Sequence, residues 1–198
     1  MYIVAEGGIN HNGDLQLCKD MISMAKNCGA NAFKLQKRSI NTVYTQEFLD
    51  SHRETPPGIL KKLPNGGTTQ REQKIALEFT WDDYDEIDRH CKTVGIDWFG
   101  SAWDLDSLWF LEQYNPPYHK IASPMVTNLE FIGEVAKLKR PVIMSTGMSY
   151  ADNVRQAIDI FERHNVHVQL ILMHCVSIYP CDPKLCNLME IKWLKSYG

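Results

Sequence analysis

The chain has 198 residues, 44% of them hydrophobic and 23% charged, which is enough apolar material for one globular domain with a buried core. The formal net charge of −3 gives no overall basic surface of the kind that binds nucleic acid. No apolar run is as long as a membrane span, and the N-terminus does not resemble a secretion signal. We therefore expect a cytoplasmic protein with neither a nucleic-acid nor a membrane partner.

Strands and helices alternate along the predicted chain. The sequence predicts a strand over 2–6, a helix from the Asp14 cap to the Cys28-Gly29 stop, a strand over 31–36 and a long mixed loop over 37–79. A helix follows from the Thr80 cap to about Val94, and its buried face is expected to consist of Tyr84, Ile87 and Cys91. It continues with strand 96–100, helix 104–113, strand 118–122, helix 127–139, strand 141–145, helix 151–164, strand 168–174 and a last helix over about 185–196.

This order repeats a β-α unit about six times, which predicts an α/β fold with a parallel sheet and right-handed crossovers. A doubly wound sheet and a TIM (β/α)8-type barrel both fit the count. A doubly wound sheet concentrates its site at one switch point, whereas a barrel gathers residues from the ends of many strands. Because most of the predicted strands end in polar residues, we expect an incomplete barrel that occupies residues 1–198.

These polar strand ends are the candidate site residues: Glu6, Lys34 with Gln36, Ser101, Lys120 with Ser123, Ser145, and His174. Lys34 and Lys120 each lie among apolar neighbours, where an unpaired ammonium is costly. The two together predict a dianionic or trianionic ligand, for example one that carries a phosphate and a carboxylate. A purely structural interpretation stays open, with snorkelling lysines, a structural ion pair at Glu6, serines in turns and a hydrogen-bonded histidine.

Six cysteines are scattered along the chain and form no Cys-x-x-Cys pair. Separate reduced thiols are the favoured interpretation. A zinc site from Cys175, Cys181 and Cys186 is the alternative, although their spacing differs from that of the common zinc ribbons.

Five motifs in this order resemble the sialic acid synthase family, the phosphoenolpyruvate-dependent N-acetylneuraminate synthases and their legionaminate and pseudaminate relatives. The motifs are Ala5-Glu6-Gly7-Gly8-Ile9-Asn10-His11-Asn12-Gly13, Phe33-Lys34-Leu35-Gln36, Lys120-Ile121-Ala122-Ser123, Ser145-Thr146-Gly147-Met148 and His174-Cys175-Val176-Ser177-Ile178-Tyr179-Pro180. The resemblance covers essentially the whole chain. It implies a barrel enzyme that condenses phosphoenolpyruvate with an amino-sugar aldehyde and releases phosphate.

The resemblance also implies roles for individual residues. Lysines and hydroxyls that match Lys34, Lys120, Ser123 and Ser145 hold phosphoenolpyruvate, and a residue that matches Glu6 contacts the sugar. Gln36, Ser101, Ser177 and Tyr179 fall at further substrate-binding positions. A Mn²⁺ or Mg²⁺ ion is held by two histidines, one of which matches His174, and polarises the sugar aldehyde.

The chain departs from the family pattern in its motifs and in its extent. Ala102 stands where a threonine is common, Met125 replaces a glutamate, and Ser177 replaces an asparagine. We expect the chain to be a fragment of a longer protein, because the second metal histidine and the C-terminal antifreeze-like domain of the family are absent from it. The resemblance implies a homodimer for the full-length parent.

Two other functions stay open at this point. A non-catalytic remnant would bind phosphoenolpyruvate or a sugar phosphate without turnover. An unrelated aldolase would form a Schiff base on Lys34 or Lys120.

Overall fold

A computed structural model of the protein describes residues 1–164 and 170–197. The chain divides into two compact units, unit 1 over Met1–Pro116 and unit 2 over Pro117–Gly198. The predicted strand over 168–174 begins outside the described residues, and its described part is the strand β8 of unit 2.

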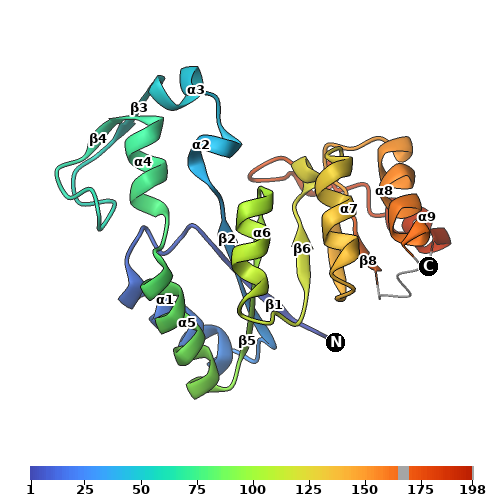
Figure 1. The fold of residues 1–198 in the computed structure, drawn as a ribbon, viewed down its shortest axis with the longest axis horizontal. Coiled ribbons are helices and arrows are strands. Elements are labelled where there is room, and N and C mark those ends of the chain that lie inside the picture. The colour runs from blue at the N-terminus through green and yellow to red at the C-terminus, as the bar shows by residue number, and fades with distance from the viewer. Residues whose placement is uncertain (165–169, 198) are drawn as a thin grey trace. The chain divides into compact units, whose positions relative to one another are not determined.

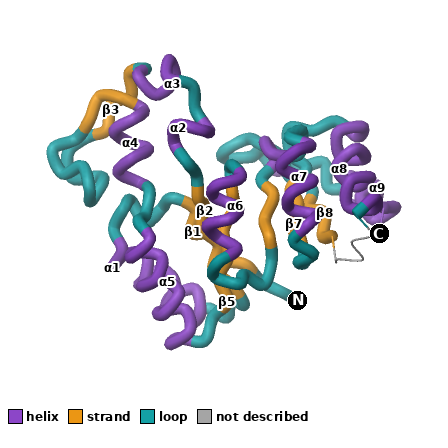
Figure 2. The backbone as a smooth tube through the Cα atoms, viewed as in Figure 1, coloured by secondary structure: helices purple, strands orange, loops and turns teal. Residues whose placement is uncertain are grey.

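Unit 1 is built on three parallel strands: β1 (Val4–Gly8), β2 (Ala32–Lys37) and β5 (Asp97–Ala102). β2 pairs with β1 on one side and with β5 on the other, as the strand-coloured tube in Figure 2 shows. The register places Glu6 opposite Lys34, and Gln36 opposite Ser101. The predicted strands over 2–6, 31–36 and 96–100 are therefore confirmed, with small shifts of their ends.

Helices α1 (Leu15–Asn27) and α5 (Trp81–Val94) pack side by side in unit 1 (Figure 1), and α6 (Leu105–Glu112) packs against β5. The Asp14 carboxylate caps α1 by accepting from two backbone N–H groups of its first turn, and Thr80 caps α5 in a capping box with Asp83. Tyr84, Ile87 and Cys91 are buried, which confirms the predicted inner stripe of α5.

The segment 37–79 is folded, so the expectation of one long loop was wrong. It contains α2 (Ile40–Val43), α3 (Gln46–Asp50), the antiparallel pair β3 (His52–Thr55) and β4 (Gly67–Thr69), and α4 (Gln70–Leu77). Leu60, Ala76 and Leu77 form a small apolar cluster of their own. These elements are too short for a periodic pattern to show in a sequence window of 11–18 residues.

Unit 2 repeats the arrangement with β6 (His119–Ile121), β7 (Val142–Ser145) and β8 (Leu170–Met173), in which β7 pairs in parallel with both neighbours. A 3₁₀ turn, η1 (Ser123–Met125), follows β6, and α7 (Leu129–Lys137) packs beside α8 (Ala151–Arg163) (Figure 1).

The helix predicted over 185–196 is shorter than expected. The structure has η2 (Pro183–Leu185), α9 (Glu190–Leu194) and η3 (Lys195–Tyr197) in its place. Asn187 adopts a φ of 41°, a left-handed conformation that no helix tolerates, so the chain turns before α9 begins.

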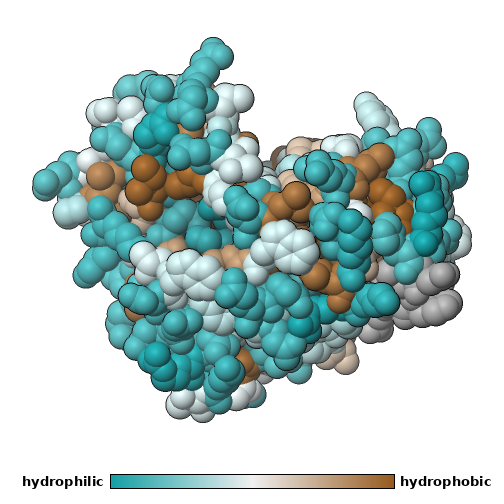
Figure 3. All heavy atoms as spheres, viewed as in Figure 1, coloured by the Kyte–Doolittle hydropathy of each residue, from teal (hydrophilic) through white to brown (hydrophobic). Residues whose placement is uncertain are grey.

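The surface of each unit is mainly hydrophilic on the face that Figure 3 presents, with smaller hydrophobic areas. Across residues 1–164 and 170–197, none of the helices has the length and apolar character needed to cross a bilayer.

Candidate active site

The first polar cluster consists of Glu6, Lys34 and Ser101, one residue from each of the three strands of unit 1. Lys34 is buried, with 7% of the residue exposed, and its ammonium lies 2.7 Å from Glu6 Oε2. It also donates a hydrogen bond of 2.9 Å to Ser101 Oγ. The Lys34 ammonium is therefore paired with the Glu6 carboxylate, and this half-exposed carboxylate is the member of the cluster that faces water.

Gln36 lies beside the first polar cluster, because residues two apart on a strand share one face. A Cβ added at Gly8 would lie 3.2 Å from Glu6 Oε1 and 3.5 Å from Gln36 Nε2, so the carboxylate and the amide approach the same point. Gln36 Oε1 accepts a hydrogen bond from the Arg38 guanidinium. The structure thus brings together Glu6, Lys34, Gln36 and Ser101, as the barrel interpretation requires.

The second polar cluster lies in unit 2 and consists of Lys120, Ser123, Ser145 and Ser177. The Lys120 ammonium is buried and donates to Ser145 Oγ at 2.6 Å and to its neighbouring carbonyl, that of Ile121, at 2.8 Å. Lys120 on β6 and Ser145 on β7 point toward one another across adjacent parallel strands.

Gly147 marks the point on which this cluster converges. A Cβ at Gly147 would lie 2.7 Å from Ser177 Oγ and 2.8 Å from Ser123 Oγ, so two hydroxyls from separate loops approach the same backbone atom. The Thr146 N–H is engaged by the Met173 carbonyl at 3.0 Å and is not available to a ligand. An anion bound at this cluster would therefore have to contact the hydroxyls and the lysine.

His174 follows β8 and lines a cavity of about 380 Å³ together with Thr146, Cys175, Glu190 and Trp193. Its Nε2 lies 2.8 Å from the Cys186 carbonyl. A carbonyl only accepts, so Nε2 carries the proton and Nδ1 keeps the lone pair that a metal would use.

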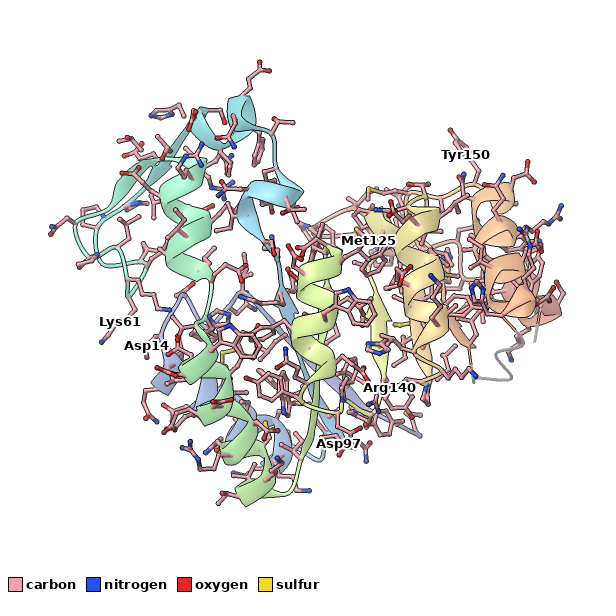
Figure 4. All side chains as sticks on the ribbon, in the orientation of Figure 1. Asp14, Lys61, Asp97, Met125, Arg140 and Tyr150 are labelled. Carbon is pink, nitrogen blue, oxygen red and sulfur yellow. The ribbon has the colours of Figure 1, made fainter. Side chains whose placement is uncertain are left out.

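The described residues do not form a metal centre. Within residues 1–164 and 170–197, no group of three or more His, Cys, Asp or Glu residues is placed to hold an ion. Met125, labelled in Figure 4, is buried in η1 and puts a thioether where the family pattern has a carboxylate. His174 therefore fits one ligand position, and the residues described here do not complete a metal centre.

Tyr179 is 92% exposed and forms no hydrogen bond or ring contact with another described residue. The structure therefore does not join it to the second polar cluster. Tyr150 projects outward from the start of α8 in Figure 4 and is similarly exposed.

All six cysteines are free thiols. Burial raises the pKa of Cys18 and of Cys91 to about 12, so these thiols stay protonated. Cys181 and Cys186 lie with their sulfurs 3.7 Å apart in the turn before α9.

Three charged residues near the end of β2, Lys37, Arg38 and Glu78, were not among the predicted site residues. Glu78 pairs with Lys37 at 3.3 Å and with Arg38 at 3.4 Å, close beyond the end of β2. Burial raises the pKa of the Glu78 carboxyl, and the two cations oppose that rise. A signal was present in the sequence, because Lys37-Arg38 directly follows the predicted strand and Glu78 interrupts an apolar run.

Comparison with known proteins places these features in a family. The sequence matches the NeuB family over residues 21–197. It is 36% identical to the N-acetylneuraminate-9-phosphate synthase of Drosophila melanogaster and 33% identical to the N,N'-diacetyllegionaminic acid synthase of Legionella pneumophila, over 99% and 98% of this chain. Those alignments cover 50% and 53% of the two relatives, so the chain spans about half their length.

A solved structure supports the same assignment. The N-acetylneuraminic acid synthetase of Leptospira borgpetersenii, in complex with citrate, superposes on this chain with a TM-score of 0.82 at 27% identity. The superposition covers 100% of this chain and 61% of the synthetase chain. The likeness confirms the predicted fold class, an α/β fold of the (β/α)8-barrel type that is present in part. From the family match over most of its length, the chain belongs to the NeuB family.

Proposed function

We propose that this protein takes part in the condensation of phosphoenolpyruvate with an N-acetylated amino-sugar aldehyde to give a sialic-acid-like nonulosonate and inorganic phosphate. Its relatives are synthases of such sugar acids. The observation that supports the proposal is the pair of buried lysines, each on a strand and hydrogen-bonded to a serine hydroxyl of a neighbouring strand. The chain covers half of those relatives, so the reaction is proposed for the whole protein of which this sequence forms a part.

The proposed reaction needs groups that stabilise negative charge, and it needs no nucleophile from the protein. Carbon 3 of phosphoenolpyruvate attacks the aldehyde carbon, water adds to carbon 2, and the carbon–oxygen bond to phosphate breaks. Phosphoenolpyruvate carries a carboxylate and a phosphate, so ammonium and hydroxyl donors stabilise it and the charge that develops during phosphate departure. In this proposal Lys34 and Lys120 supply the ammonium donors.

The other predicted site residues are assigned as hydroxyl donors to phosphoenolpyruvate or as contacts to the sugar. Ser101, Ser123, Ser145 and Ser177 supply the hydroxyl donors. Glu6, half-exposed beside Lys34, and Gln36 contact the sugar, since a carboxylate and an amide both bind sugar hydroxyls. Tyr179 is proposed as a further substrate contact.

A divalent cation, Mn²⁺ or Mg²⁺, is part of the proposal, with His174 Nδ1 as one ligand. Such an ion would act as a Lewis acid toward the aldehyde oxygen. Its remaining ligands would come from outside the described residues. Titration of Mn²⁺ followed by its electron paramagnetic resonance signal tests this, with weaker binding expected for His174→Ala. Identical titrations for the two proteins would contradict the assignment. A homodimer is likewise proposed for the whole protein.

The second candidate function is binding of phosphoenolpyruvate or a sugar phosphate without turnover. Two observations favour it for this chain. Met125 places a thioether where a carboxylate was expected, and the described residues contain no group of three or more His, Cys, Asp or Glu side chains that could hold a metal ion.

Phosphate release with phosphoenolpyruvate, Mn²⁺ and N-acetylmannosamine separates the two functions. Calorimetric titration of phosphoenolpyruvate should show binding in both cases, which Lys34→Met and Lys120→Met each weaken. Lys92→Gln, which removes an exposed cation of α5, is the matched control. Absence of phosphoenolpyruvate binding would overturn the synthase function and would restrict the second function to binding of a sugar phosphate. A borohydride-trapped adduct on either lysine would establish an aldolase instead.

A further inference from the structure

Cys181 and Cys186 form a pair of neighbouring thiols in the turn before α9, which we call the dithiol. Both thiols are free, and their sulfurs lie 3.7 Å apart. Each sulfur also lies near the Asp182 carbonyl oxygen, which is 3.4 Å from Cys181 Sγ and 3.8 Å from Cys186 Sγ. The two side chains therefore turn toward the same side of the segment and meet there.

The backbone of the turn brings the two sulfurs together. The Asp182 carboxylate accepts a hydrogen bond of 2.9 Å from the Lys184 N–H and thereby caps η2. The Pro183 carbonyl accepts a hydrogen bond of 3.2 Å from the Cys186 N–H. Such bonds between residues three apart make a tight turn, so two cysteines that are five positions apart in the sequence lie side by side.

Solvent reaches the dithiol, in contrast to the buried cysteines of unit 1. Cys181 and Cys186 are both partly exposed, and the four residues between them are exposed. Cys18 and Cys91 are 0% and 1% exposed, which keeps a dissolved oxidant away from them. The dithiol is therefore open to thiol–disulfide exchange, whose rate depends on access to the sulfur.

A zinc site, the alternative that the sequence left open, explains the pair less well. A structural zinc ion is held by four ligands. Across the described part of the chain, no three His, Cys, Asp or Glu side chains are grouped so that they could hold an ion. Cys175 is thus not joined to Cys181 and Cys186 in a site of this kind.

We infer that Cys181 and Cys186 form a reversible disulfide by exchange with a small disulfide of the glutathione class. The sulfurs must approach by about 1.7 Å to reach the bond length of about 2.05 Å, and rotation of two partly exposed side chains covers this distance. One protein thiolate attacks oxidised glutathione and releases one reduced glutathione. The second thiolate then attacks the mixed disulfide and releases another, so the two thiols lose their protons and one electron pair passes to glutathione.

The disulfide acts on His174 through the backbone. The Cys186 carbonyl accepts the hydrogen bond of 2.8 Å from His174 Nε2. Closing the bond draws Cys186 toward Cys181 and shifts this acceptor. The redox state of the dithiol therefore adjusts the imidazole that lines the cavity with Thr146 and Trp193. This consequence does not depend on a metal at His174.

The test equilibrates the whole chain with oxidised and reduced glutathione at about 0.1 mM each, followed by alkylation and tryptic digestion without reduction. Trypsin cuts after Lys184, between the two cysteines, so the disulfide leaves peptides 164–184 and 185–192 joined. We expect the ratio of oxidised to reduced form to be at least about tenfold higher for the dithiol than for the glutathione adduct of the exposed Cys28, because a neighbouring thiol acts at a millimolar effective concentration.

Serine variants assign the bond, and circular dichroism checks that each variant is folded. Cys175→Ser should keep the joined peptides, whereas Cys181→Ser and Cys186→Ser should each abolish them. Joined peptides in Cys181→Ser would overturn the inference, because Cys175 lies in the same peptide as Cys181 and would then be the partner. Glutathione adducts on both thiols without joined peptides, or zinc bound to the purified protein and released on alkylation, would overturn it too.

Nuclear magnetic resonance of the His174 imidazole tests the effect on His174. Its resonances should differ between the oxidised and reduced protein, and they should not respond to the same treatment in Cys181→Ser. Identical imidazole spectra of the oxidised and reduced protein would overturn the link to His174. Neither readout uses phosphoenolpyruvate or a sugar, so the outcome is independent of the proposed function.

Discussion

The substitution Gly147→Ala tests whether the second polar cluster is an anion site. The new methyl group would lie 2.7 Å from Ser177 Oγ, 2.8 Å from Ser123 Oγ and 3.2 Å from the Cys175 carbonyl. The two hydroxyls are ends of short, rotatable side chains, so they turn away to make room. The carbonyl contact is tight by only a few tenths of an ångström.

The expected magnitudes follow from these contacts. Hydrogen bonds to a charged ligand contribute about 1.5–3 kcal/mol each, and two that act on one ligand are not additive. We therefore expect Gly147→Ala to cost at least about 2 kcal/mol of phosphoenolpyruvate binding, a rise in Kd of about 30-fold. Overpacking typically lowers the free energy of unfolding by about 1–3 kcal/mol, and we expect about 1 kcal/mol here because the two hydroxyls rotate away.

The assay is calorimetric titration of phosphoenolpyruvate beside urea unfolding. Gly133→Ala is the matched control, because a Cβ there meets nothing within 4 Å and lies within helix α7. It should leave Kd unchanged and stabilise unit 2 by about 0.5–1 kcal/mol. An unchanged Kd for Gly147→Ala would refute the assignment of Ser123 and Ser177 to an anion site. A loss of phosphoenolpyruvate affinity that the loss of stability fully explains would refute it too.

Three further predictions concern unit 1, and urea unfolding monitors all of them. Gly13→Ala should destabilise the protein by about 2 kcal/mol more than Gly29→Ala, because both have positive φ but only Gly13 would place its Cβ 2.1 Å from a backbone carbonyl of α4; equal losses would contradict this. Glu6→Gln should destabilise by about 1 kcal/mol, a modest value because Glu6 is half-exposed, and the loss should vanish in a Lys34→Met background; an undiminished loss there would show that the ion pair is not its cause. Burial lowers the pKa of His11 from 6.5 to about 4, so the unfolded chain binds the extra proton and stability falls by about 3 kcal/mol as pH decreases from 7 to 4; His11→Gln should flatten that slope, and an unchanged slope would assign it to other groups.

The sequence determined the features that are local or periodic. The helix caps at Asp14 and Thr80 follow from short polar side chains next to apolar repeats, and the structure has both. The strands of the two units follow from short apolar runs between turn signals. Their polar ends identified Lys34 and Lys120 as residues that need partners, because an ammonium among apolar neighbours is costly without them.

Tertiary structure alone decided which partners those residues have. Lys34 meets Ser101 from 67 positions away, and Ser123 and Ser177 converge on Gly147 from separate loops, because parallel pairing joins strands that are distant in sequence. The ion pairs of Glu78 with Lys37 and Arg38 depend on the short elements within 37–79, which are below the length at which periodicity is readable. Sequence therefore located the chemical groups, and the register of the sheet and the packing of short segments decided which of them meet.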